Sequence, residues 1–185
     1  MSNIWLSSDQ HFNNYNILKY EAESRPFGSV AEMNQALINN WNNVVKPEDK
    51  VYVLGDFIMG VADRTQEILD QLNGEIILIR GNHDTLTKLK IYEENNILIK
   101  DIDYLAYKGK LFILCHFPIT NEEFMKMIRG NNSEVIALYG HVHSNAPKGY
   151  YNGTYHIGVD TNDLTPVNIE QIWQECQIGD KGEIG

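Results

Sequence analysis

Several apolar runs in this 185-residue chain stop at the same kind of sequence, a glycine followed by Asp, Asn or His. The run "VYVLGDF" ends at Asp56, "IILIRGNHD" ends at the segment Asn82 to Asp84, and "ALYGHVH" ends at His141 and His143. Short continuous apolar runs bounded by such residues indicate buried strands. In open α/β sheets, ligands bind beyond the carboxyl ends of the strands. The pattern therefore predicts strands whose ends carry the polar residues of a site.

Helical segments separate the strands of the first half. Residues 29–45 begin with Ser29 and Glu32, a capping-box pair, and continue with an apolar face. Its members are spaced by three or four residues: Val30, Met33, Leu37, Trp41 and Val44. Residues 63–74 form a second candidate helix that ends at Asn73 and Gly74, a common helix stop. Alternating strands and helices predict an α/β fold with parallel strands in this half.

The second half is expected to be richer in β-structure. We predict two strands within residues 97–117, joined by a turn at Lys108 and Gly109. Further strands are predicted within 134–144, 153–160 and 167–174, and a helix around 121–130. Because no break in composition marks a second domain, we predict one domain over residues 1–176 and a flexible tail at 177–185.

Composition narrows the classes of protein to consider. The chain has 25 acidic and 15 basic residues, a formal net charge of -10. Such a surface repels nucleic acid and anionic membranes unless cations are bound. No apolar run approaches the roughly 18 residues of a membrane span, and "MSNIWLSSDQ" lacks the pattern of a secretory signal. Two cysteines form no disulfide framework, so we expect a cytoplasmic protein without membrane association.

The polar residues at the strand ends include metal-ligand types. Taken alone, each has an ordinary interpretation, since Asp and Asn are common in turns and helix caps. Together they provide carboxylate, imidazole and amide groups, a set that suits Mn, Fe, Zn or Co. Seven such ligands are too many for one tetrahedral ion and suit two ions that share a carboxylate. The candidates are Asp9, His11, Asp56, Asn82, His116, His141 and His143.

The order of these motifs resembles that of the calcineurin-like metallophosphoesterases. The matching blocks are "DQH" at residues 9–11, "GD" at 55–56, "GNHD" at 81–84, His116, and "GHVH" at 140–143. They span about three quarters of the chain. "RPF" at residues 25–27 and "GVD" at 158–160 resemble a compact bacterial and phage-type branch of that family. The resemblance implies a four-layer αββα sandwich, with two mixed β-sheets face to face and helices outside.

The resemblance also implies roles for individual residues. Asp56 would bridge two divalent ions, with Mn favoured and Fe, Zn, Co or Ni as alternatives. One ion would be held by Asp9, His11, Asp56 and His143, and the other by Asp56, Asn82, His116 and His141. The implied catalytic residues are His83, which would donate a proton to the leaving group, and Asp84, which would orient His83.

The function implied is hydrolysis of a phosphate ester by a hydroxide that bridges the two metal ions. We expect a small substrate, namely a phosphodiester, a nucleotide or a cyclic nucleotide. Residues Arg25, Asn13 and Tyr150 are candidates for substrate contacts, although they could equally pack within loops. The physiological substrate, the native metal and the oligomeric state are left open by the sequence.

Three other functions stay open. The same metal centre could serve a nuclease, but the chain has no basic run or basic-aromatic cluster to follow a nucleic-acid backbone. It could serve a phosphomonoesterase or protein phosphatase, although short loops leave little surface for an extended substrate groove. A non-catalytic scaffold would be expected to have lost some of the ligand residues, and all of them are present here.

Overall fold

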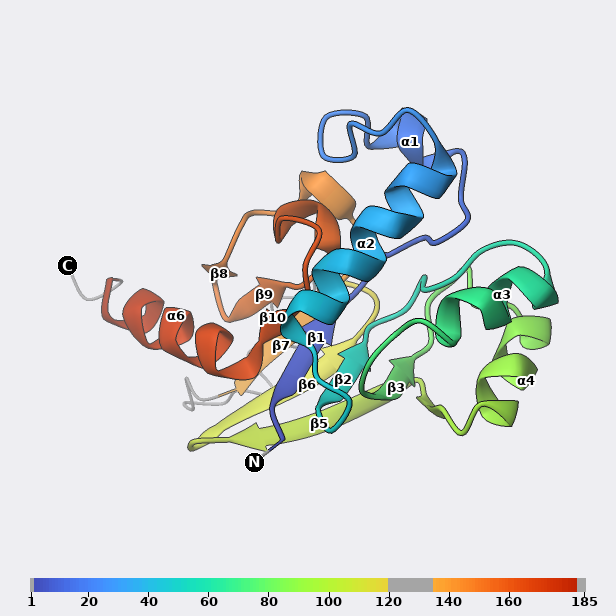
Figure 1. Ribbon diagram of the computed structural model, residues 1–185. Helices are drawn as coiled ribbons and strands as arrows, with labels where there is room; N and C mark the ends of the chain where they lie inside the picture. Colours follow the sequence, from blue (N-terminus) through green and yellow to red (C-terminus); the bar gives the residue numbers. More distant parts are fainter. Residues whose placement is uncertain (1, 120–134, 183–185) are drawn as a thin grey trace.

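The computed structural model describes residues 2–119 and 135–182. Its strands form two five-stranded sheets, in the orders β10-β1-β2-β3-β4 and β5-β6-β7-β9-β8. Both sheets are mixed, and helices lie outside them (Figure 1). The predicted α/β sandwich of two mixed sheets is therefore confirmed. The helix expected around residues 121–130 lies outside the described residues.

The first sheet is mostly parallel. Its strands are β1 (Ile4–Ser7), β2 (Lys50–Val53), β3 (Glu75–Ile79), β4 (Leu98–Lys100) and β10 (Val167–Asn168). Strands β1 to β4 run parallel, and β10 pairs with β1 in the antiparallel direction. In the register of the sheet, Ser7 lies opposite Val53, and Val53 lies opposite Leu78. The segments that follow β1, β2 and β3 therefore leave the sheet at the same edge.

The second sheet is also mixed, with three parallel strands and an antiparallel strand at each edge. Its strands are β5 (Ile102–Tyr107), β6 (Lys110–Cys115), β7 (Val135–Tyr139), β8 (Tyr150–Tyr151) and β9 (Thr154–His156). Strands β6, β7 and β9 are parallel, whereas β5 and β8 pair in the antiparallel direction. The turn at Lys108 and Gly109 joins β5 to β6 as predicted. The segments after β6 and β7 also leave at a common edge.

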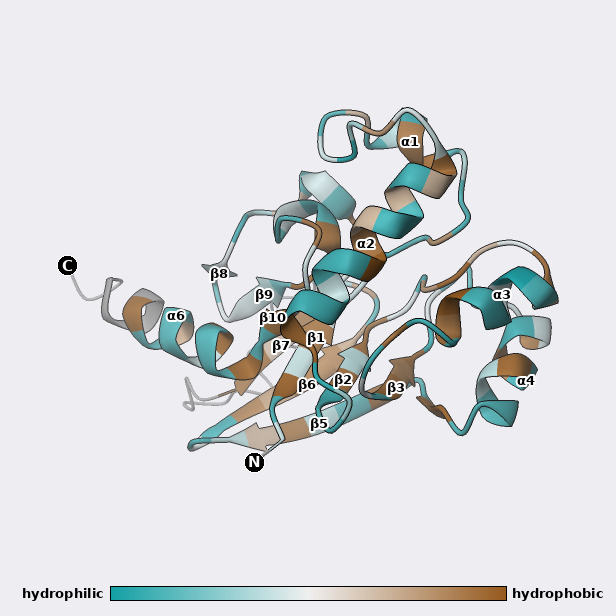
Figure 2. Cartoon of the chain, in the orientation of Figure 1, coloured by the Kyte–Doolittle hydropathy of each residue, from teal (hydrophilic) through white to brown (hydrophobic). Residues whose placement is uncertain are grey.

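A hydrophobic core joins the two sheets. Ile77 and Ile79 of the first sheet, with Leu54 directly after β2, belong to one buried cluster with Phe112, Leu114, Ile136 and Leu138 of the second sheet. A second core lies under the helices, where α2 (Val30–Val44) buries Met33, Leu37, Ile38 and Trp41. Figure 2 shows hydrophobic residues gathered on the central strands and mixed colouring on α2, α3 and α4. Burial of this apolar surface stabilises the packing of the strands and so holds their ends in fixed positions.

The helices of the first half are α1 (Ile17–Tyr20), α2, α3 (Ala62–Leu69) and α4 (Leu86–Glu94). Ser29 caps α2, because its hydroxyl accepts a hydrogen bond from the backbone N–H of Glu32 at 3.1 Å. The carboxylate of Glu32 accepts from the backbone N–H of Gly28 at 2.9 Å. The predicted start of this helix therefore agrees with the structure, with the reciprocal bond shifted by one residue.

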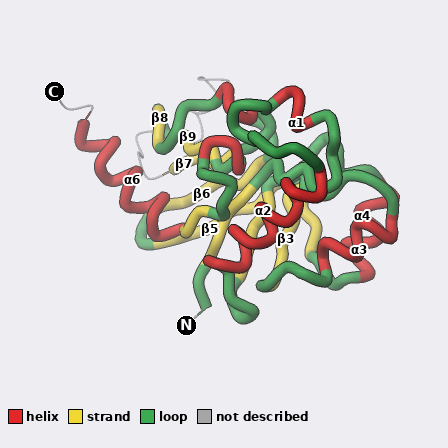
Figure 3. The backbone as a smooth tube through the Cα atoms, turned by 45° about the horizontal axis from the view of Figure 1, so that its top comes forward, coloured by secondary structure: helices red, strands yellow, loops and turns green. Residues whose placement is uncertain are grey.

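Three predictions at the level of elements were wrong. Helix α4 was not expected, and β4 is a separate strand of the first sheet rather than part of the hairpin. Residues 167–174, predicted as a strand, form only the short β10 before helix α6 (Ile169–Gly182) begins. Because α6 extends to Gly182, the tail predicted from residue 177 is helical as far as that residue. Helix α6 lies at the opposite end of the molecule from α3 and α4 (Figure 3).

Candidate metal centre

The loops after the strands bring the candidate ligands together. Asp9 follows β1, Asp56 follows β2 and His116 follows β6. The loops are joined by backbone hydrogen bonds of 3.0 Å, from the N–H of Asp9 to the carbonyl of Gly55 and from the N–H of His11 to that of Asp56. Because both sheets direct these loops to one place, the site lies at the junction of the two sheets.

Five of the candidate ligands have left-handed backbone conformations. The φ angles are 59° at Asp9, 50° at His11, 54° at Asp56, 72° at His141 and 52° at His143. Residues with a side chain rarely adopt this region, and each instance costs on the order of 1–3 kcal/mol unless the surroundings impose it. Five of the eleven non-glycine residues with positive φ in the described chain thus lie at one site, as is common where function fixes the geometry.

Two glycines allow the loops to approach the carboxylates closely. A Cβ atom at Gly81 would lie 2.3 Å from Oδ1 of Asp56. A Cβ atom at Gly140 would lie 2.0 Å from Oγ of Ser8 and 2.4 Å from Oδ2 of Asp9. Both distances are far below van der Waals contact. Any side chain at these positions would displace a candidate ligand or its neighbour.

The candidate ligand side chains form two groups. Asp9, His11 and His143 each offer one ligand atom within 4.8 Å of the others, and so do Asp56, His116 and His141. The two histidines of "HVH" therefore belong to different groups. Asn82 lies beside the second group, with Oδ1 2.9 Å from Nε2 of His116.

Asp56 lies between the two groups. Its Oδ2 atom is 3.6 Å from Nε2 of His11 and 3.5 Å from Nε2 of His116. Nitrogen and oxygen ligands bind such metals at about 2.0–2.2 Å, so two ligand atoms on one ion lie no more than about 4 Å apart. The position of Asp56 is thus compatible with a carboxylate shared by both groups.

The polar atoms at this site fit a bound cation. Oδ1 of Asp9 and Nε2 of His11 are buried and have no hydrogen-bond partner among the described residues, which is uncommon for buried polar atoms. Nδ1 of His116 lies 2.7 Å from the carbonyl oxygen of Leu54. Donation to that carbonyl leaves Nε2 of His116 with a lone pair for a metal.

Burial shifts the protonation equilibria of the site. Burial raises the pKa of Asp9 to about 6, although His143 and His116 act in the opposite direction. Burial, assisted by the nearby His143, lowers the pKa of His11 to about 2, and burial also lowers that of His141. Neutral imidazoles beside a buried carboxylate leave the site short of positive charge, which a divalent cation would supply.

His143 behaves differently from His11. Burial lowers its pKa, but the hydrogen bond to Asp160 and the charge of Asp9 outweigh burial and leave the pKa above its ordinary value. Nδ1 of His143 lies 2.7 Å from Oδ2 of Asp160. The motif "GVD" resembles one branch of the family, but no role for Asp160 was predicted. The position of Asp160 shortly after β9, like that of Asp9 after β1, could have indicated a residue of the site.

His83 lies at the rim of the site. Its side chain is 55% exposed, and Nε2 lies 3.9 Å from Oδ2 of Asp56. The ring of His83 lies 5.5 Å from that of His11. Its backbone N–H donates to Oδ1 of Asp56 at 2.8 Å. His83 is therefore held next to the two groups, with its ring accessible from solvent.

Asp84 was predicted to orient His83, and its described contacts are with backbone groups. Its buried carboxylate accepts hydrogen bonds from the backbone N–H groups of Asp56 and Gly81, both at 2.9 Å, and of Phe57 at 3.3 Å. Burial raises the pKa of Asp84. Asp84 thus links the backbone of Gly81 to the loop that carries Asp56. Among the described residues, its carboxylate makes no hydrogen bond with the His83 ring.

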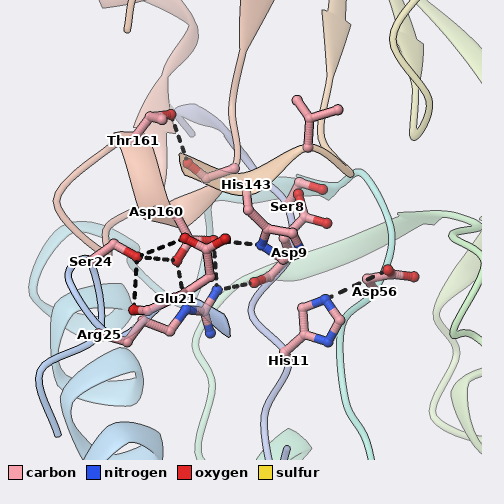
Figure 4. A network of polar contacts seen from close by, with 12 residues as sticks. Ser8, Asp9, His11, Glu21, Ser24, Arg25, Asp56, His143, Asp160 and Thr161 are labelled. Carbon is pink, nitrogen blue, oxygen red and sulfur yellow. Dashed lines mark hydrogen bonds and ion pairs between the residues drawn. The ribbon is translucent and has the colours of Figure 1, made fainter. Parts of the chain in front are cut away.

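The three candidates for substrate contacts all have contacts within the protein. Arg25 is 1% exposed, and its guanidinium binds Asp160 and backbone carbonyls (Figure 4), so it faces the protein interior. The side-chain amide of Asn13 is paired with Asn34, whose Nδ2 donates to Oδ1 of Asn13 at 2.7 Å. Tyr150 packs against the core between the sheets. Local sequence did not reveal these tertiary partners.

The fold and the paired ligand groups together define a metal-dependent hydrolase of phosphoric esters. Residues 3–157 match the model of the calcineurin-like phosphoesterase superfamily domain. The chain therefore belongs to that family. Among the described residues, no helix is long and apolar enough to cross a bilayer.

Individual relatives cover nearly the whole chain. The chain is 37% identical to the uncharacterized protein MJ1445 of Methanocaldococcus jannaschii, over 100% of this chain and 95% of the relative. It is 28% identical to the gene 66 protein of Mycobacterium phage D29, over 91% of this chain and 94% of that protein. Its fold is similar to the crystal structure of AQ665, a protein of unknown function from Aquifex aeolicus. That similarity has a TM-score of 0.75 at 29% identity, covering 94% of this chain and 99% of AQ665.

Proposed function

We propose that the protein hydrolyses a small phosphate ester at a centre of two divalent metal ions. Asp9, His11 and His143 would hold one ion, His116, His141 and Asn82 the other, and Asp56 would bridge them. The observation that carries this proposal is the position of Asp56 Oδ2, within 3.6 Å of one imidazole from each group. The mixed oxygen and nitrogen donors favour Mn, with Fe, Zn, Co or Ni as alternatives.

Such a pair of ions would lower the pKa of a bound water to near neutral and would stabilise negative charge on the phosphoryl oxygens. The chain contributes the rest of the chemistry. His83, exposed at the rim and 3.9 Å from Asp56, is placed to donate a proton to a departing alkoxide when its imidazole is protonated. The buried Asp84 keeps the Asp56 backbone in its strained conformation, so the site is organised before the substrate binds.

A cavity beside the second group supports a substrate of small size. Its volume is about 550 Å³, within the usual range for small-molecule sites. The residues that line it include Arg80, Asn82, Leu86, Ile102, His116 and Phe117. The ring of Phe117 is 48% exposed and lies 4.7 Å from that of His141. An aromatic surface next to the ligands suits a nucleotide base or another planar group.

Charge at the cavity also favours a small ester over a nucleic acid. Arg80 pairs with Asp101 at 2.7 Å, so its charge is largely matched. The chain as a whole carries a net charge of -10, which opposes binding of a long polyanion. We therefore favour a phosphodiester, nucleotide or cyclic nucleotide as substrate, and a nuclease activity is the alternative to be measured beside it. The cytoplasmic location stays a prediction.

The direct test is replacement of the shared carboxylate. In Mn-loaded protein, Asp56→Asn should lower kcat/KM for bis-p-nitrophenyl phosphate by at least about 10³-fold, because a central electrostatic contact to the reacting groups is lost. The matched control is Asp163→Asn, an 88% exposed carboxylate paired only loosely with Lys148 at 3.4 Å. Equal turnover by Asp56→Asn, Asp163→Asn and the wild type would rule out the proposed centre.

A further inference from the structure

A buried ion pair lies directly behind one of the two ligand groups. Nε of Arg25 lies 2.6 Å from Oδ1 of Asp160, and Nη2 of Arg25 lies 2.9 Å from Oδ2. Neither side chain is exposed to solvent. Figure 4 shows this pair between Ser24 and the ligands Asp9 and His143. Two parallel hydrogen bonds between a guanidinium and a carboxylate give a rigid geometry as well as attraction.

The remaining donors of Arg25 reach the backbone that carries two ligands. Nη2 donates to the carbonyl oxygen of Asp9 at 2.5 Å, and Nη1 donates to that of Gln10 at 2.7 Å. Asp9 and the following ligand His11 both have left-handed backbone conformations. Such conformations persist only where neighbouring groups impose them. The guanidinium is therefore one of the groups that holds this strained turn.

The carboxylate of Asp160 reaches the third ligand of the same group. Its Oδ2 atom lies 2.7 Å from Nδ1 of His143, and Oδ1 accepts from the hydroxyl of Ser24 at 3.1 Å. In the neutral imidazole, a proton held on Nδ1 by this bond leaves a lone pair on Nε2 of His143, and the bond fixes the plane of the ring. Carboxylates placed behind a ligand histidine act in this way in many metal sites.

The second group is supported by different contacts. His116 is oriented by the carbonyl of Leu54 at 2.7 Å, and the backbone of Asp56 is held by Asp84 at 2.9 Å. Among the described residues, no hydrogen bond or ion pair joins Arg25 or Asp160 to a side chain of this second group. Arg25 and Asp160 therefore contact the first group, whereas the bonds that orient His116 and the Asp56 backbone come from other residues.

We propose that Arg25 and Asp160 are positioning residues for one ion only, the one held by Asp9, His11 and His143. This inference rests on the proposed function, since it assumes that both groups bind cations. A buried ion pair is often close to neutral for stability, because desolvation offsets the attraction. Its contribution here is to hold three ligands from both sheets in a binding arrangement before the cation arrives. The segment of residues 12–28 contains Arg25 and places its guanidinium next to Asp160 and the backbone of Asp9.

The test is the affinity of each ion, measured by calorimetric titration of metal-free protein with Mn²⁺. In Asp160→Asn, one of two binding events should weaken by about 10- to 100-fold, the usual effect of losing such a partner. The other event should keep the wild-type affinity. Nitrogen NMR of the metal-free variant should also show that His143 loses its preference for a proton on Nδ1. Arg25→Lys keeps the positive charge but not the paired hydrogen bonds, and it should weaken the same event.

Controls separate this role from a general effect on folding. Asp163→Asn makes the same chemical change at an exposed site and should leave both affinities unchanged. Circular dichroism identifies the variants that fold. If Asp160→Asn does not fold, the affinities measured for Arg25→Lys test the proposal instead. Unchanged affinities in a folded variant, or equal weakening of both events, would overturn this proposal alone. Wild-type protein that binds no Mn²⁺ would overturn this proposal together with the proposed function.

Discussion

At the scale of single residues, His83 has an environment unlike that of the buried histidines proposed as metal ligands. Its ring is 55% exposed, whereas His11 and His116 are almost completely buried. A ligand must be fixed, but a group that transfers a proton to a substrate must also be accessible to it. The exposure of His83 therefore favours a role toward the substrate.

Replacement of His83 tests that role. His83→Gln should keep its full metal content and lower kcat by about 10²- to 10⁴-fold, the usual contribution of a general acid. The loss should be largest for alkyl esters, which have poor leaving groups, and smallest for p-nitrophenyl esters. Metal analysis and steady-state kinetics on both ester types measure these effects. Loss of a metal ion in His83→Gln would show that His83 is a ligand instead.

Sequence motifs were sufficient to select the residues that the structure brings together, because each one directly follows a strand. They were insufficient for Asp84 and Arg25. The partners of Asp84 are backbone N–H groups of two different loops, and those of Arg25 include Asp160, which is 135 residues away. Such contacts arise from tertiary packing and leave no trace in the spacing of residues within a motif.

At the scale of elements, the turn after β7 depends on Gly140. A Cβ atom there would lie 2.0 Å from Oγ of Ser8 and 2.4 Å from Oδ2 of Asp9. Gly140→Ala should therefore destabilise the protein by about 1–3 kcal/mol, the usual cost of overpacking, and weaken Mn²⁺ binding by displacing Asp9. Urea unfolding and Mn²⁺ titration measure the two effects.

The matched control for Gly140→Ala is Gly28→Ala. The nearest atom to a Cβ at Gly28 is Oε2 of Glu32 at 3.4 Å, an ordinary contact. We expect this variant to differ from the wild type by less than about 0.5 kcal/mol, as surface substitutions usually do. If Gly140→Ala were as stable as Gly28→Ala and bound Mn²⁺ normally, the close packing of this loop on Asp9 would be refuted.

Asp49 anchors the start of β1 to the turn before β2. Its buried carboxylate accepts hydrogen bonds from the backbone N–H groups of Asn3 at 2.7 Å and Lys46 at 3.1 Å, and from Nε1 of Trp5 at 3.0 Å. Burial alone would raise the pKa of Asp49, but these bonds outweigh burial and lower it below the ordinary value of 3.8. The folded state therefore prefers the charged form.

This preference predicts a pH-dependent stability. A lowered pKa stabilises the folded state above the unfolded pKa, near pH 4, and the stabilisation is lost as pH falls through the folded pKa. Asp49→Asn should lose about 2 kcal/mol at pH 7, the contribution of hydrogen bonds to a charged group. The difference from wild type should shrink below about pH 4 in urea unfolding. A difference that is equal at pH 7 and pH 3 would argue against a charged Asp49.

The elements that were not predicted have weak or misleading patterns. The sequence "VNIEQIWQ" alternates apolar and polar residues at first, which is typical of a strand. Asn168 starts α6 instead, because its side-chain oxygen accepts from the N–H of Glu170 at 2.9 Å, and Ile169, Ile172 and Cys176 then form the buried face. Helix α4 buries only Lys88 and Tyr92, so it has no apolar stripe to detect.

At the scale of the whole molecule, the chain divides its candidate metal ligands between two sheets. Asp9, Asp56 and Asn82 come from loops of the first sheet, and His116 and His141 come from loops of the second. The chain passes from one sheet to the other at Asp101, between β4 and β5. The hydrophobic pattern predicted strands but not this division between sheets, because it does not say which strands share a sheet. Only the family resemblance implied two sheets.

The division explains why both groups need the complete fold. His143 and His11 belong to the same group but to loops of different sheets, and their rings lie 5.1 Å apart. The shared core of Leu54, Ile77, Phe112 and Leu138 holds those loops at a fixed separation. Cations that bind only the folded state should stabilise it in turn by mass action.

An anomalous-scattering map from crystals of the Mn-loaded protein tests the two-ion centre most directly. We expect two peaks about 3.5–4 Å apart with Asp56 between them. His143 should bind the ion beside Asp9, and His141 the ion beside His116. A single peak, or both histidines on one ion, would contradict it.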